Sequence, residues 1–181
     1  MKYRRSLYPH WGASPDPKFD DVRQYMIAKS VVSGLVLDEG RVIGGLWYCF
    51  YTGRLYSIDE HTPDLDHVIP LKAAHIRGAG GWSPSKRKQF ANDPDNLVVV
   101  FAGSNRQKSA MVSKWLPPNI ANGADYVQRM LKVINKYGLV PTANDKKTYL
   151  FLNSKISMWQ KGIRLDPVKA WFKKTFVWED E

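Results

Sequence analysis

The chain has 181 residues, of which 27 are Lys or Arg and 17 are Asp or Glu, so its formal net charge is +10. Its single Cys excludes an intrachain disulfide and a zinc site made of cysteines alone, and no apolar run is long enough to cross a membrane. This length and 44% hydrophobic residues are sufficient for one packed domain. The basic balance favours a polyanionic partner, although a basic surface that only aids solubility fits equally well.

The N-terminal third predicts a helix followed by two strands. Residues 1–18 contain Pro, Gly and Trp, and we expect them to be irregular. Between residues 19 and 32 apolar side chains recur at helical spacing behind two aspartates, and Gly34 is expected to end this helix. The segment 41–58, RVIGGLWYCFYTGRLYSI, is typical of two strands with a turn at Gly53.

The rest of the chain predicts a second pair of strands and further helices. Residues 64–71 alternate like a strand that ends at a proline, and 96–101, NLVVVF, is a short apolar strand. The order of elements indicates an α+β fold in one compact domain with a basic helical C-terminal tail. Helices are predicted within the polar connection 72–95 with Ser83 as N-cap, from Ser104 to the break at 116–119, at 124–139 with Gly138 as cap, and at 166–178.

Candidate chemistry is concentrated in residues 64–108. Asp66 and His67 are adjacent at a strand end, so one side chain can ligate a cation while the other faces a water molecule. Asn105 adds a neutral oxygen, and a carboxylate with an amide oxygen suits a hard, partly hydrated cation such as Mg²⁺. A neutral His is a natural general base for water, and the amide of Asn96 is expected to hold the imidazole or the loop that bears it.

These residues resemble a known nuclease motif. The blocks DHVIP (66–70), DNL (95–97) and SNRQK (104–108) are similar to the HNH, or ββα-metal (His-Me finger), endonucleases. Further blocks over about residues 3–140, among them SLYPHW, WYCFYTG and WLPPN, resemble a branch related to the C-terminal domain of modification-dependent type IV restriction enzymes and to small secreted bacterial nucleases. The resemblance implies a ββα core at about 64–115, with two strands followed by a helix.

The resemblance also implies roles for individual residues. Asp66 and Asn105 would ligate one Mg²⁺, which Mn²⁺ would replace, while His67 would act as general base and Asn96 as orienting residue. Lys108 would lie near a phosphate or brace the motif. The implied activity is hydrolysis of DNA to 5′-phosphate and 3′-hydroxyl ends. Because we see no module that reads base sequence, we expect low specificity; a site-specific enzyme, an RNA-directed toxin and an idle nucleic-acid-binding module are the alternatives.

Several other side chains have more than one interpretation. Asp64 would ligate the metal through water or close the hairpin, and His75 would take a helix-face position or support the site. Cys49 lies among aromatic residues and is predicted to be buried rather than nucleophilic. Contacts to nucleic acid are predicted for Lys86, Arg87, Lys88, Arg106 and Lys108, although a solvated helix face also explains the first three.

The expected organisation is a nuclease domain over residues 1–140 and a basic, aromatic-rich helical extension over 141–181, packed on the same domain. In the extension, aromatic residues at helical spacing favour core packing over the stacking of bases. With no recognisable signal peptide and one Cys, the sequence favours a cytoplasmic protein; a secreted protein is the alternative if the chain is a trimmed mature form. The oligomeric state stays open.

Overall fold

Two small antiparallel sheets and five α-helices form the part of the chain that the computed structural model describes, residues 2–111 and 115–140. The predicted α+β class is confirmed, whereas the predicted extension 141–181 and its helix at 166–178 lie outside the described residues. The strands are β1 (Val31–Asp38), β2 (Arg41–Tyr48), β3 (Leu55–Ser57), β4 (Asp64–His67) and β5 (Leu97–Val100), and the helices are α1 (Val22–Ser30), α2 (Leu71–Ile76), α3 (Pro84–Ala91), α4 (Ala102–Met111) and α5 (Ile120–Tyr137).

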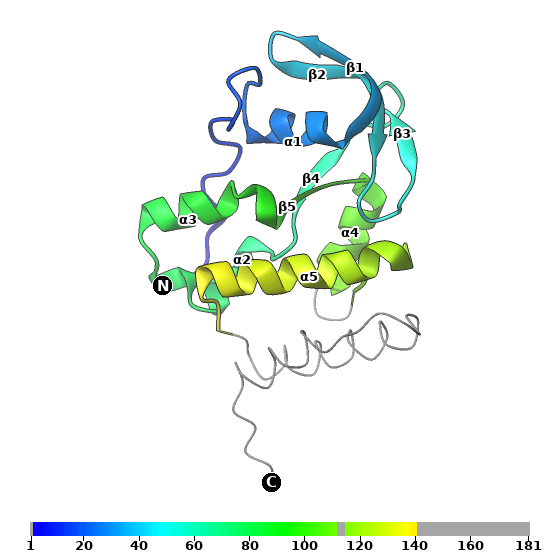
Figure 1. Cartoon of the computed structure of the whole chain (residues 1–181). Coiled ribbons are helices and arrows are strands. Elements are labelled where there is room, and N and C mark those ends of the chain that lie inside the picture. The colour runs from blue at the N-terminus through cyan, green and yellow to red at the C-terminus, as the bar shows by residue number, and fades with distance from the viewer. Residues whose placement is uncertain (1, 112–114, 141–181) are drawn as a thin grey trace.

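A ββα unit occupies the middle of the molecule, with α1 and the sheet β1-β2-β3 at one end and α5 at the other (Figure 1). Strands β4 and β5 pair antiparallel, so that Asp66 lies opposite Val98 and His67 opposite Leu97. Helix α4 follows directly and begins at Ala102, which places Asn105 in its first turn. Every residue of β5 is buried, as expected for a strand covered on both faces.

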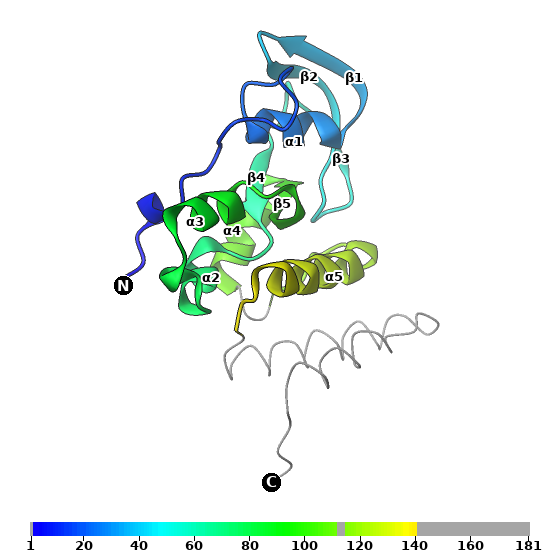
Figure 2. The same cartoon turned by 60° about the vertical axis from the view of Figure 1, so that its left-hand side comes forward.

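The connection between β4 and β5 holds two helices, and the view in Figure 2 shows both beside the hairpin. The short helix α3 was predicted, and its cap is confirmed because the Ser83 hydroxyl accepts from the amide of Lys86 at 3.2 Å. Helix α2 was not predicted. It has six residues, which is too few for a periodic signal, and it forms because Leu71 and Ala74 pack into the core.

Strand β1 corrects the expectation that the first helix continues to Gly34. Helix α1 begins at Val22, three residues after the expected start, where Asp21 caps the amide of Gln24 at 2.8 Å, and it ends at Ser30. The β-branched residues that follow favour an extended backbone, and they pair with β2. Gly34 has φ = +67° within an irregular stretch of this pairing, so it accommodates a bulge and does not end the helix.

Helix α5 fixes the opposite end of the domain. It begins at Ile120, four residues before the predicted start, behind the N-cap Asn119, and it ends at the predicted Gly138 in a left-handed conformation. Its apolar stripe is buried, and the hydroxyl of Tyr137 donates to Asp93 at 2.8 Å beside the start of β5. Among the described residues, no helix is long and apolar enough to cross a bilayer.

Cys49 is fully buried at the end of β2, as predicted. Its sulfur accepts from the amide of Phe101 at 3.1 Å, and the neighbouring amide of Phe50 donates to the carbonyl of Val99 at 3.0 Å. These contacts connect the chain after β2 to the second strand of the ββα unit. The next residue, Tyr51, is thereby held beside the candidate site described below.

Gly53 closes the turn after Tyr51 with φ = +68°, and a Cβ atom there would lie 1.9 Å from the side-chain nitrogen of Asn119. We expect Gly53→Ala to lower the free energy of unfolding by about 1–3 kcal/mol, because an L side chain is strained in this conformation. Gly123→Ala is the matched control, since no atom lies within 4 Å of its added Cβ and alanine favours the helix. Urea unfolding measures both; an equal loss in the two variants would contradict the argument.

Candidate functional site

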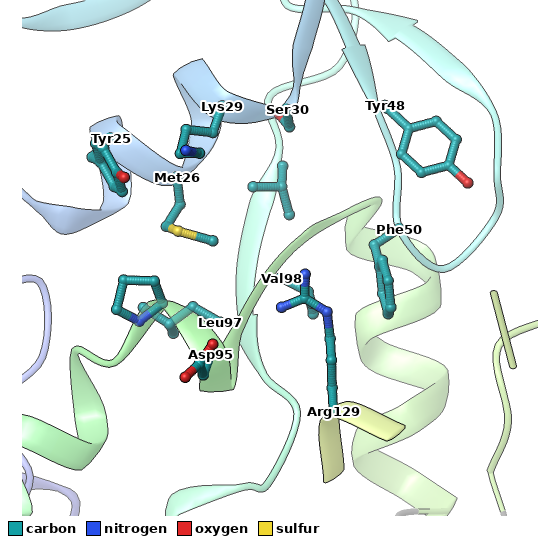
Figure 3. Close-up of a pocket in the computed structure, with 12 residues that line it drawn as sticks. Tyr25, Met26, Lys29, Ser30, Tyr48, Phe50, Asp95, Leu97, Val98 and Arg129 are labelled. Carbon is teal, nitrogen blue, oxygen red and sulfur yellow. The ribbon is translucent and has the colours of Figure 1, made fainter. Parts of the chain in front are cut away.

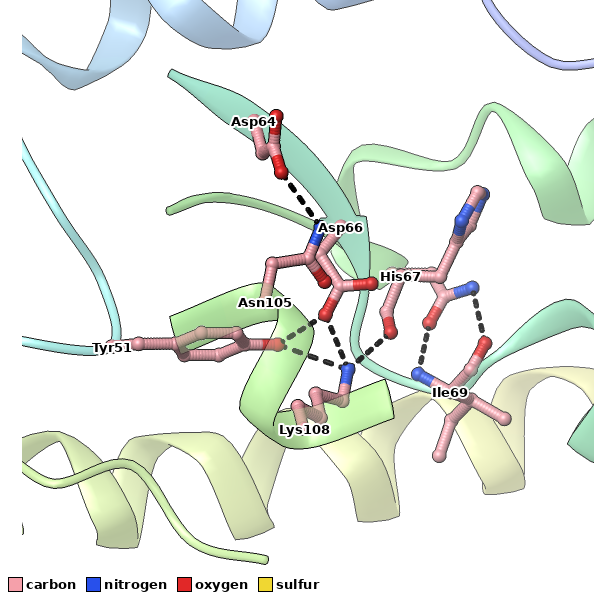
Figure 4. Close-up of polar contacts among 8 residues, drawn as sticks. Tyr51, Asp64, Asp66, His67, Ile69, Asn105 and Lys108 are labelled. Atoms are coloured by element: carbon pink, nitrogen blue, oxygen red, sulfur yellow. Dashed lines mark hydrogen bonds and ion pairs between the residues drawn. The ribbon is translucent and has the colours of Figure 1, made fainter. Parts of the chain in front are cut away.

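Asp66 is held by two donors that both reach the same carboxylate oxygen. Its Oδ2 accepts from the hydroxyl of Tyr51 at 2.7 Å and from Nζ of Lys108 at 2.6 Å. Figure 4 draws no contact between its Oδ1 and the other residues shown. The side chain of Asp66 is 17% exposed to solvent. The arrangement leaves one hard oxygen of Asp66 available to a cation while the other oxygen fixes the orientation of the carboxylate.

Lys108 is only 2% exposed, and its ammonium group faces three acceptors. Besides Asp66, Nζ donates to the carbonyl oxygen of His67 at 2.6 Å and to the hydroxyl oxygen of Tyr51 at 2.9 Å. Burial lowers the pKa of Lys108, and the carboxylate of Asp66 opposes that shift. Of the two roles considered for this residue, the geometry supports the brace. The expectation that Lys108 contacts nucleic acid is corrected, because its ammonium is enclosed by protein.

Asn105 presents its amide to the site in a defined orientation. Its Nδ2 donates to Oδ2 of Asp64 at 3.1 Å, and Figure 4 shows the amide oxygen on the side of Asp66. An amide that donates on one side presents an oxygen acceptor on the other. Asp64 therefore contacts Asn105 directly and orients it.

His67 is 6% exposed, and its Nε2 donates to the carbonyl oxygen of Ala91 at 2.9 Å. Because a carbonyl only accepts, the proton of the neutral ring is on Nε2 and the lone pair is on Nδ1. Desolvation by burial is the main cause that lowers the pKa of His67 to about 4, while the bond to Ala91 raises it. The imidazole is therefore neutral at neutral pH.

Asn96 is fully buried and bonds the chain just after His67. Its Oδ1 accepts from the amide of Ile69 at 2.8 Å, its Nδ2 donates to the carbonyl of the same residue at 3.3 Å, and its own carbonyl accepts from Val68 at 2.8 Å. Of the two alternatives, the side chain holds the loop and makes no described contact to the imidazole.

Two predicted site residues have other surroundings. His75 contacts the hydroxyl of Tyr8 through Nδ1 at 3.0 Å and packs edge-on against Tyr3, so it lies against the N-terminal segment. Arg87 is 7% exposed and donates to the carbonyls of Leu7 and Trp82, which corrects the expectation that it contacts phosphate. The remaining cations of the predicted set are on the surface: Lys86, Lys88 and Arg106.

Two residues beside the site were not predicted from the sequence. Tyr51 donates to Asp66, and Trp11 stacks on His67 with ring centroids 5.9 Å apart and an interplanar angle of 14°. Both belong to sequence blocks that carried the resemblance, WYCFYTG and SLYPHW, and membership of those blocks was the available signal. Nothing in their local spacing assigns them a role.

A cavity of about 350 Å³ lies apart from this cluster, between α1, β5 and α5 (Figure 3). Tyr25, Met26, Lys29, Phe50 and Arg129 are among its lining residues. None of Asp66, His67 and Asn105 lines it. The candidate chemistry therefore does not use this cavity.

The donor set fits a hydrated hard cation. Among residues 2–111 and 115–140, no three His, Cys, Asp or Glu side chains gather closely enough to hold a metal ion by themselves. The pair Asp66 and Asn105 instead offers two oxygens, and Mg²⁺ characteristically retains several waters beside one or two protein ligands. The fit depends on the second oxygen of Asp66, because Lys108 and Tyr51 occupy the first.

The ββα unit carries a buried neutral histidine, a carboxylate and an amide, a set of groups suited to metal-assisted hydrolysis. Comparison with known proteins specifies the family. The model for GmrSD restriction endonucleases, C-terminal domain, matches residues 42–150, and the chain belongs to this family. It is thus a member of a nuclease family, which agrees with the nuclease class that the sequence resemblance implied.

A curated relative is 29% identical over 147 residues, which are 80% of this chain and 71% of that protein. It is described as an uncharacterized secreted protein of Arthroderma benhamiae. The expectation of a cytoplasmic location is contradicted by this relative and was wrong. No solved structure matches the chain.

Lys108→Met removes the ammonium group while keeping a long apolar side chain. We expect the free energy of unfolding to fall by about 3–5 kcal/mol, because the partly buried carboxylate of Asp66 then lacks its counter-charge. Tyr51→Phe, which removes only a hydroxyl from the same oxygen, is expected to cost about 1.5–3 kcal/mol. Chemical unfolding without divalent metal measures both, and wild-type stability in Lys108→Met would rule out the brace.

Proposed function

We propose that the protein is a divalent-metal-dependent endonuclease that hydrolyses DNA phosphodiester bonds, with His67 as the general base. The observation that carries this proposal is the bond from Nε2 of His67 to Ala91, which reserves Nδ1 as a lone-pair donor on the residue that follows Asp66. Membership of a restriction endonuclease family supports DNA as the substrate.

Asp66 and Asn105 are the proposed ligands of Mg²⁺, and Mn²⁺ is expected to substitute because it favours the same oxygen donors. When bound, the ion would supply positive charge to the scissile phosphate and the leaving 3′-oxygen. Asp64 keeps the oxygen of Asn105 available through its bond to the amide nitrogen. Because Lys108 and Tyr51 both donate to Oδ2 of Asp66, Oδ1 is the oxygen proposed to ligate the ion.

His67 performs the proton transfer in this proposal. Its Nδ1 accepts a proton from the water that attacks phosphorus, so the hydroxyl becomes part of the 5′-phosphate. The bond from phosphorus to the 3′-oxygen breaks, and that oxygen takes a proton from solvent to become the 3′-hydroxyl. Asn96 holds Val68 and Ile69 in place and thereby limits movement of the backbone that bears the imidazole. The proton then passes from the imidazolium to solvent.

The exposed cations are the proposed contacts to the DNA backbone. Lys86, Lys88 and Arg106 are exposed, and the whole chain carries a net charge of +10. Phosphate contacts of this kind position the duplex without reading its sequence, so we propose low sequence specificity. The family also contains restriction enzymes, which supports site-specific cleavage as the alternative. Sequencing the ends of digested DNA distinguishes low-specificity cleavage from site-specific cleavage. EDTA-sensitive cleavage separates both from an idle binding module.

The secreted relative supports action outside the cell, and we propose the same for this chain. Free DNA in the surroundings would then be the substrate. Presence of the protein inside the producing cells, without any in their medium, would contradict this location.

His67→Ala is expected to reduce cleavage of supercoiled plasmid in Mg²⁺ by about 10²–10⁴-fold, the usual contribution of a positioned general base. Among the described residues the ring forms a single hydrogen bond, to a backbone carbonyl, so we expect the variant to keep its circular dichroism spectrum and its binding to DNA in EDTA.

His61→Ala is the matched control, since this histidine is exposed and packs against Tyr56 and Phe101. It should cleave at close to the wild-type rate. Cleavage by His67→Ala at the rate of the control would overturn the proposed mechanism.

A further inference from the structure

The N-terminal segment lies over the candidate general base. The ring of Trp11 stacks on the imidazole of His67, 5.9 Å between centroids and 14° from parallel, and His10 packs edge-on against Trp11 at 4.9 Å. Trp11 comes more than fifty positions before His67 in the chain, so this contact depends on tertiary structure alone.

Asn92 clamps the backbone on both sides of Trp11. Its Nδ2 donates to the carbonyl of Pro9 at 2.7 Å, and its Oδ1 accepts from the amide of Gly12 at 2.7 Å. Arg87 adds a bond to the carbonyl of Leu7 at 3.1 Å. Asn92 directly follows helix α3, whose last residue, Ala91, supplies the carbonyl that bonds His67. One short stretch of chain therefore holds both the imidazole and the residue stacked on it.

Trp11 itself has φ = +60°, a conformation that residues other than glycine rarely adopt. Strained backbone of this kind persists only where the surrounding contacts impose it, and it clusters at functional sites. The two bonds from Asn92 supply that constraint. The result is a tryptophan ring directed at His67 from a backbone that would otherwise turn elsewhere.

The bond to Ala91 alone does not fix the imidazole, because the ring can still rock about the line from Nε2 to the carbonyl oxygen. A flat ring against one face restricts that remaining motion. We propose that Trp11 is a positioning residue that, held by the Asn92 clamp, fixes the plane of the His67 ring and so the direction of its Nδ1 lone pair. This inference rests on the proposed general-base role of His67.

Two substitutions separate the ring from the strained backbone. Trp11→Gly removes the ring but tolerates the positive φ, so the clamp on the segment is retained. Trp11→Phe keeps an aromatic face. With a DNA oligonucleotide we expect Trp11→Gly to lower kcat about 10–100-fold with KM within about twofold, and Trp11→Phe to restore most of the loss, since a small misplacement of a catalytic group costs rate.

The same substitution in a His67→Ala background tests whether Trp11 acts through His67. We expect Trp11→Gly to have no further effect there, because the ring it positions is absent. An unchanged kcat in the single variant, or an equal loss in both backgrounds, would overturn the proposal. Phe19→Ala is the matched control, because this aromatic residue of the same N-terminal region packs against Tyr25.

Nuclear magnetic resonance of the His67 ring keeps this inference distinct from the proposed function. Trp11→Gly should shift the ring-proton signals of His67 and broaden them, because the stacked indole no longer shields and restrains the imidazole; Phe19→Ala should leave them unchanged. Wild-type signals in Trp11→Gly would overturn the positioning role. Wild-type cleavage by His67→Ala would instead overturn the general-base mechanism. In that case the ring-proton signals of His67 in Trp11→Gly would still show whether Trp11 holds the imidazole.

Discussion

The contact between the ammonium of Lys108 and the carboxylate of Asp66 is the interaction on which the site depends. It joins helix α4 to strand β4, and the same nitrogen also bonds the carbonyl of His67 and the hydroxyl of Tyr51. A buried ammonium without acceptors would be strongly unfavourable, so these groups have to meet for the ββα unit to close. The same bonds fix Asp66 and the backbone of His67, which couples formation of the fold to formation of the site.

Around this contact, the side chains of the candidate site are oriented by further hydrogen bonds within the protein. Asn96 holds the residues after His67, Ala91 selects the protonated nitrogen of the imidazole, and Asp64 sets the amide of Asn105. The bonds made by His67 and Asn96 are buried, and hydrogen bonds are electrostatically stronger there than in water. The candidate site is thus preorganised, and within the described part of the chain no hydrogen bond occupies Oδ1 of Asp66 or Nδ1 of His67.

The parts of this site that sequence predicts are those defined by local spacing. Asp66, His67 and Asn105 follow from a strand end and a helix start, and the paired strands follow from apolar patterning. Tyr51, Trp11 and the inward direction of Arg87 depend on contacts between segments far apart in the chain, which periodicity does not encode. Strand β1 was missed because its apolar run continued a helical pattern, and pairing with β2 decided its conformation.

The central claim is that Asp66 and Asn105 together form a cation site served by His67. The most direct test of this claim is a structure of crystals grown with Mn²⁺, with diffraction measured at the manganese absorption edge. We expect an anomalous peak within ligand distance of Oδ1 of Asp66 and of the amide oxygen of Asn105, with His67 still bonded to Ala91 and its Nδ1 free of metal. No peak at these oxygens under saturating Mn²⁺, or a peak on the imidazole of His67, would contradict the account.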